Sequence, residues 1–259
     1  GATDMRLPMP DLLATKDGRL AAFFLLYVAE GIPLGFTATA VATQMRRQDL
    51  GPEAIGAFVG SLYLPWAFKW LAGPFVDVFS SDRFGRRRLW ILLTQVGMVA
   101  TLIAAIPVDF VSQLGLFTAI ILIHNVFSAT QDVAIDALAV SVLPRHERGV
   151  ANGFMFAGAS VGQAIGGSGV LFLAAVVPFG ATYWFVVAAI LLVTVFVVLP
   201  LKEAPGPARP ADGRGPLAAI GSDLARFVRD AWRAFTGSRA AMVGVVVSLL
   251  PIGAYALSL

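Results

Sequence analysis

The sequence contains no cysteine, and charged residues make up only 14% of its 259 positions. Without cysteine, a disulfide-stapled secreted scaffold is excluded. A soluble globular domain carries about 25% charged residues, so this chain has too few charges to cover a surface that faces water. Its 58% hydrophobic content excludes a disordered chain, and its long apolar runs lack the period-two alternation of a membrane β-barrel. We therefore expect an all-α polytopic membrane protein.

Groups that perform catalysis or bind metals are also scarce. The sequence has only two histidines, His124 and His146, and neither lies in a cluster of metal-ligand residues. It contains no recognisable pairing of a nucleophile with a base. The glycine-rich segment 153–169 is not followed by Lys-Ser/Thr, so it does not indicate a phosphate-binding loop. We expect no metal, no cofactor and no enzymatic activity.

Seven stretches are long and apolar enough to cross a bilayer, which requires about 20 residues because the hydrocarbon core is about 30 Å thick. They are residues 20–43, 55–75, 89–106, 114–138, 150–176, 181–199 and 240–259. An N-terminus in the cytoplasm puts every Lys and Arg on the cytoplasmic side except Arg46, Arg47 and Lys69. The net charge of +3 therefore reflects membrane topology and does not indicate a nucleic-acid partner. We expect a multi-pass protein of the inner (plasma) membrane.

The chain divides into three parts by composition. Residues 1–200 are expected to form a six-helix transporter half. Residues 201–238 are expected to be a cytoplasmic linker, because 202–216 hold four prolines and three glycines, with an amphipathic helix at about 217–235. Residues 239–259 are expected to be the first helix of an incomplete C-terminal half. A piece of a longer transporter and a genuine half-protein both fit this layout.

Two polar residues are expected near the middle of the membrane. Glu30 and His124 each lie ten residues into a predicted span, at a depth of about 15 Å. An acid and an imidazole at the same depth could couple proton movement to transport. The alternative is that each makes a private hydrogen bond within the bundle.

A second set of residues suits the binding of a solute. Lys69 could bind an anionic group as a point charge, or its ammonium group could extend to the membrane interface. The neighbouring aromatic residues Tyr63 and Trp66 fit either a wall that stacks on sugars or an interfacial belt. Asn125 and Gln163 are further candidates for the polar lining of a cavity.

Charged residues also gather at the expected cytoplasmic level. These residues are Asp77, Arg86, Arg87, Arg88, Asp132 and Asp136. They could form a gating network that latches this side of the bundle, or a static cluster that only compensates buried charge. Separately, Gly158, Gly162 and Gly166 recur at every fourth residue, a spacing typical of close helix packing in membranes.

Several motifs resemble those of one family. Residues 73–77 (GPFVD) and 82–88 (DRFGRRR) resemble the loop signature between helices two and three of the major facilitator superfamily, in a longer form. Residues 27–35 (YVAEGIPLG), 69–74 (KWLAGP) and 128–137 (SATQDVAIDA) are similar to the branch that contains the AmpG-type muropeptide permeases and the acetyl-coenzyme A transporters.

The resemblance implies two six-helix halves that alternate access to a central cavity. It implies that Glu30, Lys69, His124 and Gln163 face this cavity, and that Asp77, Arg86–Arg88 and Asp132 act in the cytoplasmic gate. The expected function is proton-coupled import of an amphiphilic solute such as a muropeptide or a CoA thioester. The alternative is a non-transporting scaffold or assembly subunit of a larger membrane complex. The expected partners are the lipid bilayer, the solute, protons and a second transporter half or other membrane subunits.

Overall fold

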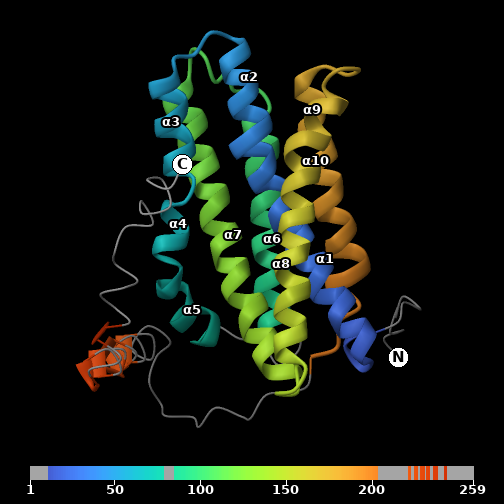
Figure 1. The fold of residues 1–259 in the computed structure, drawn as a ribbon, viewed down its shortest axis with the longest axis vertical. Coiled ribbons are helices and arrows are strands. Elements are labelled where there is room, and N and C mark those ends of the chain that lie inside the picture. Colours follow the sequence, from blue (N-terminus) through green and yellow to red (C-terminus); the bar gives the residue numbers. More distant parts are fainter. Residues whose placement is uncertain are drawn as a thin grey trace, which may run out of the picture. The chain divides into compact units, whose positions relative to one another are not determined.

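The computed structural model describes residues 11–78 and 85–203, together with scattered positions between 221 and 243. The chain divides into two units, Gly1–Ala208 and Arg209–Leu259. Every regular element among the described residues is a helix, and in the first unit the long helices form an antiparallel bundle (Figure 1). The expected all-α fold is therefore confirmed.

The helices of the first unit follow one another with short connections. Three of them continue through a π-helical turn, which adds one residue to the ordinary α-helical turn. In chain order the elements are η1 (Leu12–Ala14), α1 (Lys16–Gly35), η2 (Phe36–Val41, π), α2 (Ala42–Arg47), α3 (Pro52–Ser61), α4 (Leu64–Ala67), η3 (Lys69–Leu71, 3-10), α5 (Ala72–Val78), α6 (Arg86–Ala105), α7 (Leu114–Val142), α8 (Arg148–Ala164), η4 (Ile165–Gly169, π), α9 (Val170–Leu173), α10 (Phe179–Val193) and η5 (Thr194–Val198, π).

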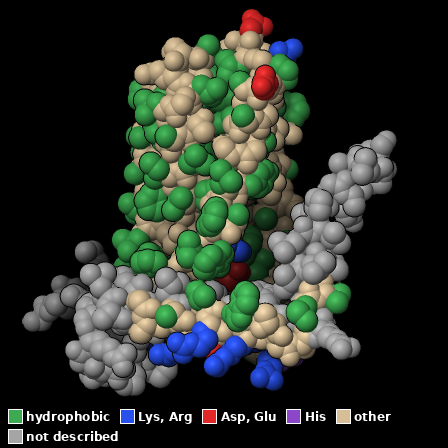
Figure 2. All heavy atoms as spheres, turned by 90° about the vertical axis from the view of Figure 1, so that its left-hand side faces the viewer, with side chains coloured by type: hydrophobic (Ala, Val, Ile, Leu, Met, Phe, Trp, Pro, Cys, Tyr) green, Lys and Arg blue, Asp and Glu red, His purple; other side chains and the backbone are tan. Residues whose placement is uncertain are grey.

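Five of the described helices are long and apolar enough to cross a membrane. They correspond to the first, third, fourth, fifth and sixth predicted spans, and they cover Lys16–Arg47, Arg86–Ala105, Leu114–Val142, Arg148–Leu173 and Phe179–Val198. Large apolar side chains remain exposed along these helices, and Figure 2 shows such side chains spread over the side of the bundle. This surface suits contact with lipid.

The second predicted span is not a continuous helix, so the expectation of one helix over 55–75 is wrong. The chain passes through α3, α4, η3 and α5 on its way from one end of the bundle to the other (Figure 1). Pro65 has no N–H to donate to the Ser61 carbonyl, so the helical hydrogen-bond ladder is interrupted there. The Trp66 N–H bonds the Tyr63 carbonyl at 3.1 Å instead of the Leu62 carbonyl that a regular helix would use.

The second unit is described at a few positions only. Those from 221 to 236 are helical, in the region where the sequence predicts an amphipathic helix at 217–235. Most of 201–220 and most of the seventh predicted span, 240–259, lie outside the described residues. The predicted three-part division of the chain stays a prediction.

The closest helix pair is α1 with α8. A Cβ atom added to Gly158, Gly162 or Gly166 would overlap backbone carbonyl oxygens of α1. Added to Gly31 or Gly35 of α1, it would overlap the backbone of α8 in the same way. Because glycines face each other from both helices, the two backbones come into direct contact. This contact fixes the position of α1. Two residues of α1, Tyr27 and Glu30, belong to the candidate site described below.

Candidate functional site

Five polar side chains from three segments meet around one charged pair. The Lys69 Nζ atom lies 2.6 Å from Asp132 Oδ2, which joins the broken second segment to α7. The Tyr27 hydroxyl of α1 lies 2.8 Å from Asp132 Oδ1 and 2.9 Å from Asp136 Oδ1. Glu30, one helical turn after Tyr27, lies within electrostatic reach of Lys69 and both aspartates. We call these five residues the charged cluster.

The charged cluster is partly open to its surroundings. Glu30 and Asp132 are buried, whereas 39% of the Lys69 side chain is exposed and Asp136 is exposed. Among the described residues, Glu30 Oε2 has no hydrogen-bond partner, although the side chain of Trp66 lies close to this carboxyl group. The open side of the charged cluster therefore presents an ammonium group backed by two buried acids.

The number of hydrogens in the charged cluster does not match the number of acceptors. Tyr27 has one hydroxyl hydrogen but two carboxyl neighbours, Asp132 and Asp136, at hydrogen-bond distance. Both contacts are favourable only if one carboxyl group is protonated and donates to the tyrosine oxygen. Three carboxyl groups, including that of Glu30, also face a single lysine, and uncompensated buried charge is costly. The charged cluster therefore brings together more carboxyl groups than one lysine and one tyrosine hydroxyl can compensate.

The break in the second segment positions Lys69. The Leu62 carbonyl, which lacks its helical partner, accepts a hydrogen bond of 2.9 Å from the Asn125 side-chain amide of α7. Seven residues further along both segments, Lys69 meets Asp132. α7 therefore contacts the broken segment at two points, and the two points are seven residues apart in both segments. Asn125, which the sequence predicts to bind solute, is buried and committed to this hydrogen bond.

His124 lies in the interface between α6 and α7. It is fully buried, and its Nδ1 atom lies 3.1 Å from both Met98 O and Thr101 Oγ1. Since a carbonyl oxygen only accepts, Nδ1 carries a hydrogen that it donates to Met98 O. Nε2 has no partner among the described residues. No hydrogen bond in the described part of the chain joins His124 to Glu30, so the structure does not bring the two predicted proton-coupling residues into direct contact.

The predicted gating residues divide into separate groups. Asp132 and Asp136 face Tyr27, as described, whereas the arginines at the start of α6 face the end of the sixth span. The backbone N–H groups of Arg87 and Arg88 bond Glu203 Oε2 at 2.9 and 3.2 Å, and Arg88 Nη2 bonds Leu199 O at 2.6 Å. Arg86 opens the same helix and is half-buried. The side chain of Asp77 lies outside the described residues.

Sequence reasoning missed four residues that make prominent contacts. Glu203 follows the sixth apolar stretch directly, where an acid can cap the start of a neighbouring helix. Arg19 of α1 and the buried Glu147 before α8 form a bidentate ion pair, with contacts of 2.8 and 3.0 Å. Tyr27 could have been found from its position three residues before Glu30, on the same helix face.

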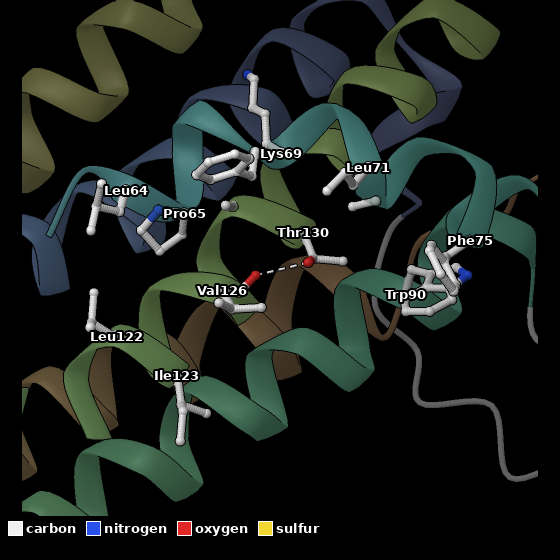
Figure 3. A pocket seen from close by; sticks show the side chains of 13 residues that line it. Leu64, Pro65, Lys69, Leu71, Phe75, Trp90, Leu122, Ile123, Val126 and Thr130 are labelled. Carbon is white, nitrogen blue, oxygen red and sulfur yellow. Dashed lines mark hydrogen bonds between the residues drawn. The ribbon is translucent and has the colours of Figure 1, made fainter. Parts of the chain in front are cut away.

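The remaining predicted solute-binding residues lie around the charged cluster or at a distance. Tyr63 and Gln163 are exposed and Trp66 is half-buried. Beside the cluster is an apolar pocket of about 590 Å³ between the broken segment and the helices α6 and α7. Figure 3 shows the Lys69 amine directed away from the labelled apolar side chains of this pocket. The lysine stem thus separates the apolar pocket from the charged cluster.

Comparison with known proteins places this chain in a family. Residues 20–259 match the family model of the Major Facilitator Superfamily, and the chain belongs to this superfamily. An anhydromuropeptide permease of Escherichia coli K12 is 31% identical over 188 residues, and an uncharacterized protein of Haemophilus influenzae is 33% identical over 175 residues. These matches cover 71% and 68% of this chain but only 38% and 41% of the relatives.

The comparisons confirm the resemblance to the muropeptide-permease branch that the motifs indicated. They describe a multi-pass membrane protein of a transporter family, as expected, and not an enzyme family. Because the chain spans about two fifths of the length of these relatives, the activity of the whole protein is a matter for proposal.

Proposed function

We propose that the protein is a secondary active transporter that imports an anhydromuropeptide and is driven by a proton gradient. The geometry of the charged cluster carries this proposal, because Lys69 and Asp132 form a 2.6 Å pair beside surplus carboxyl groups. The name of the E. coli relative supports the choice of solute. A CoA thioester is the second candidate, since it also combines anionic and apolar parts.

Proton coupling would work through competition for Lys69. While Asp132 is ionised, it holds the ammonium group of Lys69. A proton that enters through Glu30 and reaches Asp132 or Asp136 would weaken this hold, and Lys69 could then bind a carboxylate of the solute. Loss of the proton would restore the Lys69–Asp132 pair and displace the solute. Trp66, beside Glu30, offers an aromatic face to a sugar ring.

Alternating access would require a second six-helix half that rocks against this one. In this proposal the N-terminus is cytoplasmic, which follows the distribution of basic residues. The Arg19–Glu147 pair and the contacts of Arg87 and Arg88 with Glu203 then lie at the cytoplasmic end. They would stabilise this half as a rigid body, and residues 201–238 would link it to the second half.

The test is uptake of radiolabelled anhydromuropeptide by proteoliposomes that contain the full-length protein. We expect saturable uptake that an imposed pH gradient accelerates and a proton ionophore abolishes. Competition with an unlabelled CoA thioester identifies the preferred solute. Absence of solute uptake, combined with stable co-purification of other membrane subunits, would overturn the proposal and favour an assembly role.

A further inference from the structure

A second site lies at the other end of the first long helix. A cavity of about 670 Å³ separates the end of that helix, in η2 and α2, from α3. Thr39, Thr43, Arg46 and Arg47 line it on one side, and the bare backbone at Gly56 lines it on the other. No atom lies within 4 Å of the position that a Cβ would take at Gly56, so this wall leaves room for a ligand.

The two arginines in this cavity lack acidic partners. Among the described residues, no carboxylate oxygen lies within ion-pair distance of Arg46 or Arg47, although Asp49 and Glu53 are close in sequence. The described contact of Arg46 is a 3.5 Å approach of Nη1 to the Leu50 carbonyl. Two adjacent guanidinium groups that face a cavity without compensation attract an anion.

Two hydroxyl groups extend this row of donors into the cavity. The Thr37 hydroxyl bonds a carbonyl of its own helix at 2.9 Å, whereas the hydroxyls of Thr39 and Thr43 have no hydrogen-bond partner in the described part of the chain. Thr39, Thr43 and Arg46 lie at successive helical turns and face the same cavity. Together they present several donors and no carboxylate.

The positions of these arginines are unusual for a membrane protein. Arg46 and Arg47 are the two loop-facing basic residues that the positive-inside pattern leaves on the outer side. The same continuous helix carries Tyr27 and Glu30 about 24 Å away, at a rise of about 1.5 Å per residue. Both sites face the broken second segment, the outer one through α3 and the charged cluster through Lys69. They thus lie along one seam between two segments.

We infer that the cavity lined by Thr39, Thr43, Arg46 and Arg47 is an anion-binding site that captures a carboxylate or phosphate group of the solute before the solute reaches Lys69. This inference rests on the proposed function. The paired guanidinium groups would steer an anionic solute to the outer mouth and hold it by bidentate hydrogen bonds. The site then raises affinity and the association rate and does not take part in proton coupling.

The test compares an Arg46→Gln/Arg47→Gln double variant with the wild-type full-length protein. A Lys16→Gln/Arg145→Gln variant, which removes two exposed charges at the opposite end, is the matched control. We expect the double variant to raise the KM for labelled anhydromuropeptide about tenfold, with kcat and the response to a pH gradient unchanged. The rise of KM with ionic strength should also become shallower in this variant only.

Two further outcomes separate the possible sources of the anion. In phosphatidylcholine vesicles and in vesicles that also contain phosphatidylglycerol, we expect the same wild-type KM. A higher wild-type KM with phosphatidylglycerol, absent in the double variant, would reassign the site to lipid headgroups and overturn solute capture. A wild-type KM in the double variant would also overturn it while leaving the proposed transport intact. Absence of uptake by the wild type would instead contradict the proposed function itself.

Discussion

The side-chain amide of Asn125 donates a hydrogen bond of 2.9 Å to the backbone carbonyl of Leu62. This carbonyl is one that the break before Pro65 deprives of its helical partner, and in a membrane no water is at hand to replace that partner. The same helix, α7, binds the broken segment again through Asp132 and Lys69. The break is therefore a fixed structural feature that sets the position of the lysine.

Replacing Asn125 by leucine removes the donor while nearly conserving volume. The Leu62 carbonyl would be left buried without a partner, so we expect a loss of about 1–3 kcal/mol in the free energy of unfolding. Displacement of Lys69 should also reduce uptake. Thermal unfolding of the purified variant in detergent measures the first effect. Asn152→Leu, at an exposed position of α8, is the control, and equal melting of both variants would contradict the role assigned to Asn125.

Glycine packing between α1 and α8 makes a second prediction. In Gly162→Ala the new methyl group would overlap the Val28 carbonyl, and we expect destabilisation by about 1–3 kcal/mol or more because neither backbone can yield without separating the helices. Gly153→Ala places its methyl group in open space on the same helix and should be neutral or slightly stabilising. Unfolding temperatures of the pair provide the comparison. An equally tolerated Gly162→Ala would show that the two helices are not in contact.

Glu30 and His124 should differ in their effect on proton coupling. Glu30→Gln is expected to fold and to abolish acceleration of uptake by a pH gradient, because it removes an ionisable group from the charged cluster. His124→Asn is expected to lower stability, since it removes the contacts with Met98 and Thr101, and to retain the gradient response. Uptake at several imposed gradients separates these effects. A gradient response lost in His124→Asn and kept in Glu30→Gln would reverse the assignment.

Sequence patterns predicted the elements that depend on local hydropathy. The span expected at 114–138 is α7, Leu114–Val142, and the span expected at 89–106 is α6, Arg86–Ala105. The prediction of one continuous helix over 55–75 was wrong because mean hydropathy carries no information about the backbone N–H that Pro65 lacks. An apolar average predicts that a segment enters the membrane, and it does not predict that the segment is one helix.

Which side chains meet across helices was harder to predict than how deep each residue lies in the membrane. The sequence predicted solute binding for Lys69 and a gating role for Asp132, whereas in the structure the two residues form one ion pair. Spacing along a helix identifies which face a residue occupies, but it does not identify which neighbouring helix that face meets. For the same reason the sequence did not assign Glu203 to the start of α6, over 100 residues away in the chain.

The central claim is that Lys69 and Asp132 act as one unit in transport. A double-mutant cycle on the rate of anhydromuropeptide uptake tests it most directly, with Lys69→Gln, Asp132→Asn and the double variant in the full-length protein. Removing either partner of this half-buried pair leaves the other charge uncompensated within the bundle, so we expect each single variant to lose about a hundredfold in rate. The double variant should then be no slower than either single variant. Losses that multiply in the double variant, or wild-type rates in either single variant, would contradict the account.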